Sequence, residues 1–385
     1  MPSILLYVSS LCSQKTEKQI FQNDPKSIGL QVQKYHRLLT RGFVANGVSV
    51  KVLSYHKGLQ PVFASENEDE DGIEYRYIRA SNGKLNHPSV LWKSFWTTRT
   101  FLKQNKDAGV ICDVLNFSVS TGAILAARLM GCKVVGIITD FPEMLSGKCG
   151  LKESLHWKII HNCTGYVLLT EAMAGKVRPG AKPYLVIEGQ VDSAMEEQSN
   201  CLENKWSGLN CVYAGGLHKK YGIETLVKAF ILADIPNSIF HIYGDGDFVP
   251  ELCQIRNEHI FYHGIVPNAE VVAAELASTL LINPRPTTEE FVKYSFPSKN
   301  MEYMVSGTPV LTTNLPGMPE GYKDYVYIFD DESVKGMARK IREVLSLQPK
   351  ELHEKGLSAK EFVLMEKNNI IQAKKIIQLI ERIRS

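Results

Sequence analysis

The chain has 385 residues, of which 44% are hydrophobic and 22% are charged, and its formal net charge is +3. This length predicts two domains or one large one, and the balance is that of a globular protein. So small a net charge gives no support to nucleic-acid binding, and no apolar run approaches the ~20 residues of a membrane span.

The eight cysteines are scattered, and none forms a Cys-x-x-Cys pair. No cysteines and histidines stand at zinc spacing, so we expect buried reduced thiols and neither a metal nor another cofactor. The first ten residues are apolar but lack the basic start of a signal peptide, so they predict a first strand. We therefore expect a cytoplasmic protein, with association at the inner face of the cytoplasmic membrane left open.

Short apolar runs alternate with helical patterns over the first half of the chain. The runs predict strands at 4–9, 49–54, 75–79, 110–116, 133–138, 165–169 and 184–187. The patterns between them predict helices at 30–46, 92–106, 121–130, 155–162 and 171–177. This alternation is typical of an α/β domain with a mostly parallel sheet and helices on both faces.

A polar stretch with little periodicity, 192–208, predicts a linker between two domains. The α/β pattern then restarts, with strands at 210–214, 238–243, 259–263, 280–283 and 309–312 and helices at 223–233, 269–277 and 297–305. We therefore predict an N-terminal domain over 1–191 and a second α/β domain over 209–367. The amphipathic tail, 368–385, is expected to pack back onto the first domain.

A glycine-rich turn follows the first strand of the second domain. Gly215 and Gly216 allow backbone amides to approach a ligand, and the next helix offers its unpaired N–H groups. Lys219 and Lys220 could add charge against a phosphate. The turn lacks the Gly-Lys-Ser/Thr of a P-loop, and no Gly-x-Gly-x-x-Gly follows the first strand of the chain. A plain strand–helix turn with two solvated lysines is the alternative.

The segment 283–302 gives a stronger signal. Pro297 stands where a helix would begin, and Ser298, Lys299 and Asn300 form its first turn. Backbone amides at this position could hold a diphosphate, and the lysine could neutralise it. Glu302 follows about one turn later and could accept hydrogen bonds from hydroxyl groups. The alternative is a capped helix with a solvated lysine.

Six segments together resemble family 4 glycosyltransferases, over nearly the whole chain, and in particular those of bacterial polysaccharide assembly. The segments read SIGLQVQKYHRLL, VLLTEAM, YAGGLHKKYGIETLVKAF, HIYGDGD, FYHGIVP and YSFPSKNMEYMVSGTPVLTT. The resemblance implies the GT-B fold, in which two Rossmann-like, doubly wound α/β domains face each other across a cleft. It implies a retaining transferase that moves a sugar from a nucleotide-diphosphate donor, such as a UDP-sugar, to an acceptor hydroxyl in polysaccharide or glycolipid assembly.

The resemblance also assigns roles in the donor segment. Glu302 matches the second glutamate of a Glu-x7-Glu pattern and is implied to bind the ribose hydroxyls. The first glutamate is replaced by Tyr294, next to Ser295, and the spacing of Glu289 and Glu290 does not fit. The sugar side of the donor site therefore departs from the family pattern.

A second departure lies in the glycine-rich turn. Gly216 and Tyr221 occupy positions where similar proteins carry basic residues, and Lys219 or Lys220 could compensate. The resemblance further places the nucleobase near Gly244, Asp245 and His263. A satisfied strand-end histidine is the alternative for His263.

In the N-terminal domain, Gly29 and Gln31 open a helix that resembles the acceptor-side loop of the family. Asp140 and Glu143 follow the strand 133–138 and could position the acceptor or the sugar, although loop carboxylates also cap helices. Together with Lys299 and Glu302, Asp140 is the candidate for catalysis. No metal is expected, because helix N-termini and lysines can stabilise the leaving diphosphate.

The stretch 76–106 has seven basic residues, no acidic residue and interleaved aromatics. It could contact anionic lipid headgroups, which would suit a sugar or lipid-linked acceptor. A solvated helix with core-facing aromatics is the alternative, and no recognised nucleic-acid module accompanies it. Two rival functions stay open: a nucleotide-sugar epimerase of similar fold, and a non-catalytic or partner-dependent subunit that binds the donor.

Overall fold

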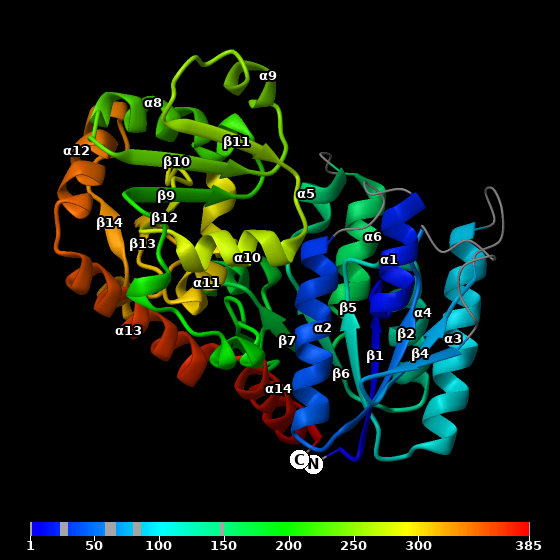
Figure 1. Cartoon of the computed structure of the whole chain (residues 1–385). Coiled ribbons are helices and arrows are strands. Elements are labelled where there is room, and N and C mark those ends of the chain that lie inside the picture. Colours follow the sequence, from blue (N-terminus) through cyan, green and yellow to red (C-terminus); the bar gives the residue numbers. More distant parts are fainter. Residues whose placement is uncertain (1, 24–29, 58–66, 80–85, 147–149, 385) are drawn as a thin grey trace. The chain divides into compact units, whose positions relative to one another are not determined.

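The structure is a computed structural model that describes residues 2–23, 30–57, 67–79, 86–146 and 150–384. The chain forms two compact units (Figure 1). The first comprises Met1–Ile187 and Asn369–Ser385, and the second comprises Glu188–Asn368. The polar stretch 192–208 therefore belongs to the second unit rather than standing between the two, and the tail helix belongs to the first unit.

The described part of the first unit contains an eight-stranded sheet with the strand order β3-β4-β2-β1-β5-β6-β7-β8. The strands are β1 (Ile4–Ser9), β2 (Ser49–Ser54), β3 (Asn67–Glu70), β4 (Ile73–Tyr77), β5 (Gly109–Asp113), β6 (Val134–Ile138), β7 (Gly165–Leu168) and β8 (Tyr184–Val186). Every pairing is parallel except that of β3 with β4. The predicted parallel α/β sheet is confirmed, with one antiparallel edge strand.

The helices of this unit include α2, which packs directly against the C-terminal α14 (Figure 1). Gly42 on α2 leaves no room for a side chain, because a Cβ there would lie 2.2 Å from the carbonyl oxygen of Asn369. Apolar residues of both helices share one buried core with the central strands. The helices are α1 (Gln14–Asn23), α2 (Leu30–Ala45), α3 (Asn86–Gln104), α4 (Phe117–Leu129), α5 (Pro142–Ser146), α6 (Leu151–Ile160), α7 (Glu171–Val177) and α14 (Asn369–Arg384).

The edge strand β3 and helix α1 are absent from the sequence-based prediction. The Glu68 carboxylate on β3 joins them, because it accepts hydrogen bonds from the hydroxyls of Ser13 (2.5 Å), Thr16 (2.9 Å) and Tyr77 (2.9 Å). The contacts of Glu68 with Ser13 and Thr16 link segments more than fifty residues apart, so local patterns do not reveal them.

The second unit contains a parallel sheet with the strand order β11-β10-β9-β12-β13-β14. Its strands are β9 (Leu209–Ala214), β10 (Ser238–Tyr243), β11 (Ile260–Gly264), β12 (Leu280–Asn283), β13 (Val310–Thr313) and β14 (Tyr327–Phe329). Its helices are α8 (Ile223–Ala233), α9 (Val249–Leu252), α10 (Asn268–Ala277), α11 (Ser298–Ser306), α12 (Val334–Leu345) and α13 (Pro349–Lys367). The arrowheads of β9, β10 and β11 point the same way (Figure 1), so the carboxyl ends of these strands lie together at one end of the sheet. Parallel α/β sheets bind ligands at this end, which we call the carboxyl edge.

Candidate functional site

Three turns at the carboxyl ends of β9, β10 and β11 are joined through their backbones. The Gly215 N–H donates to the Tyr243 carbonyl oxygen (2.9 Å), and the Gly244 N–H donates to that of Gly264 (2.8 Å). Gly244 has φ +125°, and a Cβ there would lie 1.8 Å from the Gly215 carbonyl oxygen. Only glycine fits this position, so the turns form one rigid edge.

Helix α11 begins at this edge without a side-chain cap. Its Asn300 N–H donates to the Pro297 carbonyl oxygen (3.0 Å). Among the described residues, the backbone N–H groups of Ser298 and Lys299 have no hydrogen-bond acceptor. An uncapped helix N-terminus carries a partial positive charge, and its free amides are suited to an anion.

Tyr303 holds α11 against the end of β9. Its buried hydroxyl accepts a hydrogen bond from the Ala214 N–H (2.8 Å) and donates to the Ala214 carbonyl oxygen (3.3 Å). One turn earlier, the Lys299 side chain runs along Gly215, where a Cβ would lie 2.1 Å from Lys299 Cε and 3.0 Å from its Nζ. The glycine-rich turn and the first turn of α11 therefore lie together.

The Lys299 ammonium has no carboxylate partner in the part of the chain that the structure describes. Beneath it, the buried Asn283 Nδ2 donates to the Asn300 Oδ1 (2.6 Å), which ties β12 to the first turn of α11. The Asn300 Nδ2 atom is buried without a hydrogen-bond partner. Both asparagines lie outside solvent, so they position the helix start rather than contact bulk water.

The two lysines of the glycine-rich turn have protein partners. Lys219 Nζ donates to the Glu251 carboxylate (2.8 Å), which raises the lysine pKa, and the Lys219 N–H donates to Asp247 (2.9 Å). The Lys220 Nζ lies 5.3 Å from the centre of the Tyr221 ring. A lysine that is already paired with a carboxylate attracts a phosphate less strongly, so Lys219 is the weaker of the two candidates for a phosphate contact.

At the β10–β11 side of the edge, Asp245 accepts a hydrogen bond from the Gly246 N–H (2.9 Å). The His263 ring stacks on Tyr243 with 4.3 Å between centroids, and His263 Nε2 lies 3.0 Å from His241 Nδ1. Burial lowers the pKa of both histidines, in the case of His241 to about 4. These neutral, stacked rings are a flat surface of the kind on which a nucleobase can pack.

Three predicted donor residues lie around the start of α11. The Tyr294 N–H donates to the Phe291 carbonyl oxygen (3.0 Å), and the Ser295 hydroxyl donates to the same oxygen (3.4 Å). Glu302 is half-buried in the second turn of α11. Glu289 precedes the short 3-10 helix Glu290–Lys293, and Glu290 begins it, so both lie before the start of α11 in the chain.

In the first unit, Asp140 follows β6 and accepts a hydrogen bond from the Phe141 N–H (2.9 Å). Burial raises the pKa of this carboxyl group. Glu143 bonds Lys176 (2.8 Å) and the Trp157 Nε1 (3.1 Å), and although burial opposes it, the hydrogen bond with Lys176 lowers the Glu143 pKa. Glu143 therefore ties helices α5, α6 and α7 together.

Of the acceptor-side pair, Gly29 lies outside the described residues, and Gln31 is exposed at the start of α2. The sequence analysis missed Gln33, which is buried. Its amide accepts from the Cys12 N–H (2.8 Å) and donates to the Ser10 carbonyl oxygen (2.8 Å), which fixes the loop after β1. The helical spacing of Gln33, His36 and Thr40, all buried, was the available signal.

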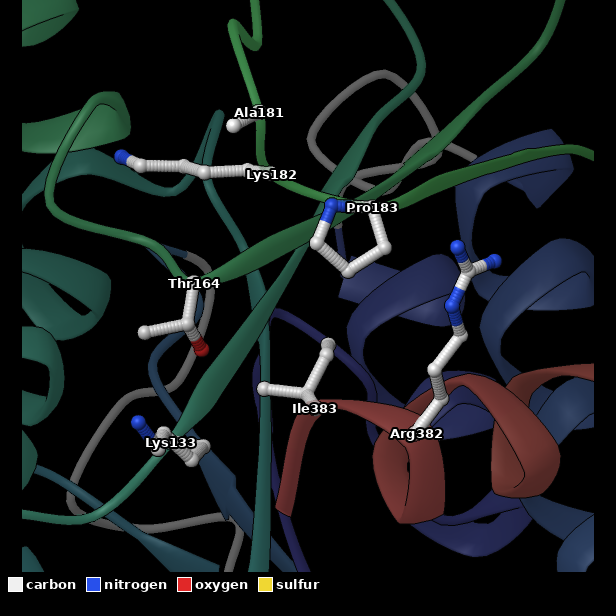
Figure 2. Close-up of a pocket in the computed structure, with 7 residues that line it drawn as sticks. All are labelled: Lys133, Thr164, Ala181, Lys182, Pro183, Arg382 and Ile383. Carbon is white, nitrogen blue, oxygen red and sulfur yellow. The ribbon is translucent and has the colours of Figure 1, made fainter. Parts of the chain in front are cut away.

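A shallow hollow of about 450 Å³ lies at the amino ends of β6, β7 and β8, opposite to the carboxyl ends that Asp140 follows (Figure 2). Lys133, Lys182 and Arg382 line it, but in the view of Figure 2 the Lys182 ammonium and the Arg382 guanidinium lie on opposite sides of Pro183. The Lys182 Nζ donates to the His161 carbonyl oxygen (2.5 Å). These cations do not converge on one point, so we assign no ligand to the hollow.

Within the described ranges, no group of three or more histidine, cysteine, aspartate or glutamate side chains is placed to hold a metal ion. The helices in those ranges include none that is both long and apolar enough to cross a membrane.

The model of the family described as glycosyl transferases group 1 matches residues 167–361, just over half of the chain. The chain belongs to this family. The match covers nearly all of the second unit, including the glycine-rich turn and the uncapped start of α11. The family identifies the protein as a glycosyltransferase. No curated protein sequence matches the chain.

Solved glycosyltransferase structures share the fold over the whole length. Sucrose-phosphate synthase from Thermosynechococcus elongatus has a TM-score of 0.70 at 14% identity, with 98% of each chain covered. HepE from Anabaena in complex with UDP has a TM-score of 0.65 at 14% identity, with 99% of this chain and 100% of HepE covered. The lipopolysaccharide outer core galactosyltransferase WaaB has a TM-score of 0.64 at 14% identity, with 98% and 99% covered. The predicted GT-B fold class is confirmed.

Proposed function

We propose that this glycosyltransferase takes a nucleotide-diphosphate sugar as donor and holds the diphosphate at the carboxyl edge of the second sheet. The observation that carries the proposal is the Lys299 side chain against Gly215, beside the free amides of Ser298 and Lys299. Two sources of positive potential, a lysine and a helix N-terminus, meet where a glycine leaves room for a ligand. The HepE structures solved with UDP and with UDP-glucose favour a UDP-sugar.

The transfer breaks the bond between the sugar and the diphosphate and forms a bond from the sugar to an acceptor hydroxyl. Negative charge develops on the departing diphosphate, and the amides and Lys299 stabilise it without a metal ion. Glu302, half-buried one turn along α11, accepts hydrogen bonds from the ribose hydroxyls. We propose that the sugar keeps its anomeric configuration.

On the acceptor side, Asp140 is the candidate to position the incoming sugar or hydroxyl. Its carboxyl group is half-buried after β6, and burial raises its pKa above that of an exposed aspartate. Gln31 is exposed at the start of α2, whereas Glu143 is held by Lys176. Asp140 is therefore a stronger candidate than Glu143 in this unit.

The acceptor in this proposal is a sugar or a lipid-linked sugar of cell-surface polysaccharide assembly, met at the inner face of the cytoplasmic membrane. Helix α3 supports membrane contact, because Trp92 is 62% exposed and Trp96 is 42% exposed. The Arg99 guanidinium lies 5.2 Å from the Trp96 ring centre, so a cation accompanies the aromatics. Exposed indoles beside basic side chains suit an anionic lipid surface.

The test is turnover by the purified full chain with UDP-, GDP- and ADP-sugars and a crude lipid acceptor. We expect release of the nucleoside diphosphate from one donor class that depends on the acceptor. An interconverted sugar on an intact nucleotide would point to an epimerase instead. Donor that binds and is never consumed would favour a non-catalytic subunit, and no donor binding at all would contradict the proposal.

A further inference from the structure

Arg285 follows β12 and occupies an unusual environment at the same edge. Its guanidinium carbon lies 5.1 Å from the centre of the Tyr221 ring and 4.7 Å from that of Phe291. The two rings are themselves 6.2 Å apart and meet edge to face, so the guanidinium lies beside the pair and is close to both rings. Such a pair of cation–π contacts fixes the orientation of a side chain that is otherwise flexible.

No counter-charge accompanies this guanidinium in the described ranges. Arg285 forms no ion pair there, and its Nε atom is buried without a hydrogen-bond acceptor. Burial lowers the Arg285 pKa. A half-buried cation without a counter-charge is unfavourable, so an anion that arrives from outside the chain would be stabilised beside it.

The contacts of Arg285 direct this charge toward the glycine-rich turn. Tyr221, one of the two rings, packs on Gly216, where a Cβ would lie 3.2 Å from the tyrosine ring. Burial raises the pKa of Tyr213, and the charge of Arg285 partly opposes that shift. The Tyr213 hydroxyl in turn donates to the Gly216 carbonyl oxygen (2.8 Å).

The glycine-rich turn therefore has two cations near it. Lys299 runs along the preceding glycine, and Arg285 stands beside Tyr221. The Gly216 N–H has no acceptor among the described residues. Two positive side chains and a free amide match an anion with more than one charged oxygen group better than they match a single phosphate ester.

We infer that Arg285 is a second cation of the donor site and binds the diphosphate of the nucleotide together with Lys299. The inference rests on the proposed function and extends it to a residue outside the glycine-rich turn and outside α11. Because the guanidinium is already fixed by Tyr221 and Phe291, little freedom is lost when a phosphate binds to its remaining N–H groups. A planar guanidinium can hold two phosphate oxygens at once.

The experiment is calorimetric titration of the full chain with UDP, GDP and ADP, with the matching nucleosides, and with inorganic pyrophosphate. Arg285→Met keeps a side chain that can lie beside the two rings but removes the charge. We expect it to weaken binding of the nucleoside diphosphate and of pyrophosphate by about 10- to 100-fold, and binding of the nucleoside by less than about 3-fold. Arg339→Met, the same change at an exposed arginine of α12, should leave all three unchanged.

Diphosphate affinity of Arg285→Met within about 3-fold of wild type would overturn the inference while leaving the proposed function intact. A wild-type chain that binds no nucleoside diphosphate would overturn both. If Arg285→Met does not fold, wild-type protein with 15N-labelled arginine decides the matter. The Arg285 Nε–H resonance is identified as the one that is missing from the spectrum of Arg285→Lys. Pyrophosphate should shift this resonance in the wild-type protein, and a resonance that does not move would contradict the inference.

Discussion

The hydroxyl of Tyr303 both accepts from the backbone N–H of Ala214 and donates to its carbonyl oxygen, at 2.8 and 3.3 Å. This pair of bonds joins the middle of α11 to the end of β9. It sets the height of α11 above the sheet. Lys299, one turn earlier on the same face, is placed over Gly215 as a consequence.

Replacement of Tyr303 by phenylalanine should therefore lower both stability and donor affinity. The buried Ala214 N–H loses its partner, at a cost of about 1–3 kcal/mol in the free energy of unfolding. Urea unfolding measures this cost. Tyr325→Phe is the matched control, because Tyr325 stacks on Phe362 without a side-chain hydrogen bond in the described ranges. Equal losses in the two variants would contradict the assigned role.

Lys299 and Glu302 should affect different parts of the donor. Lys299→Met removes the charge beside Gly215, so we expect affinity for the nucleoside diphosphate to fall about 10- to 100-fold with little change for the nucleoside. Glu302→Gln should instead reduce the preference for ribose over 2′-deoxyribose. Titration calorimetry measures both effects, with Lys228→Met, at an exposed lysine of α8, as the control. Unchanged diphosphate affinity in Lys299→Met would rule out this lysine as a phosphate contact.

The glycines of the edge should differ sharply in their tolerance of a side chain. The new Cβ of Gly244→Ala would lie 1.8 Å from the Gly215 carbonyl oxygen, at a residue with φ +125°. We therefore expect the free energy of unfolding to fall by roughly 3 kcal/mol or more and donor binding to be abolished. Gly264→Ala places its Cβ in open space at φ +71°, so we expect its free energy of unfolding to fall by only about 1–2 kcal/mol. Urea unfolding of both variants is the test, and similar losses would show that the packed turns are not rigid.

The His241–His263 pair predicts a pH dependence of stability. Burial, reinforced by His263, lowers the His241 pKa from 6.5 to about 4. Between these values the unfolded chain binds a proton that the folded chain does not, so stability is complete above pH 6.5 and is lost as the pH falls toward 4. The half-exposed ring limits the loss to about 1–2 kcal/mol.

His241→Gln should reduce this loss. We expect the difference in the free energy of unfolding between pH 7.5 and pH 4.5 to be about 1–2 kcal/mol smaller in the variant than in wild type. The Asn210 Oδ1, which lies 3.2 Å from His241 Nε2, can still be reached by the glutamine amide. Parallel pH profiles of the two proteins would show that His241 does not titrate in this range.

The sequence predicted every parallel strand except β14, and most helices, because each buries a local apolar pattern. Strand β3, with the sequence NEDE, gave no such pattern, since its position depends on pairing with β4 and on contacts to Glu68. Helix α1 buries only Thr16 and Ile20, too few positions for a clear helical period. These elements depend on distant partners rather than on their own composition.

Only those parts of the candidate site that have a local sequence pattern were predicted. Gly215 and the start of α11 are visible locally, because glycine and proline mark turns and helix starts. The pairing of Lys219 with Glu251 and the placement of Arg285 beside two aromatic rings are tertiary contacts. No spacing in the chain reveals which of these cations is already neutralised and which is available to a ligand.

The most direct test of the donor site is a crystal structure of the full chain with the nucleoside diphosphate that binds best. The account predicts diphosphate density within hydrogen-bond distance of the Lys299 Nζ and of the backbone amides of Gly216 and Ser298. A nucleotide bound with its diphosphate away from these groups, or at another edge of either sheet, would contradict it.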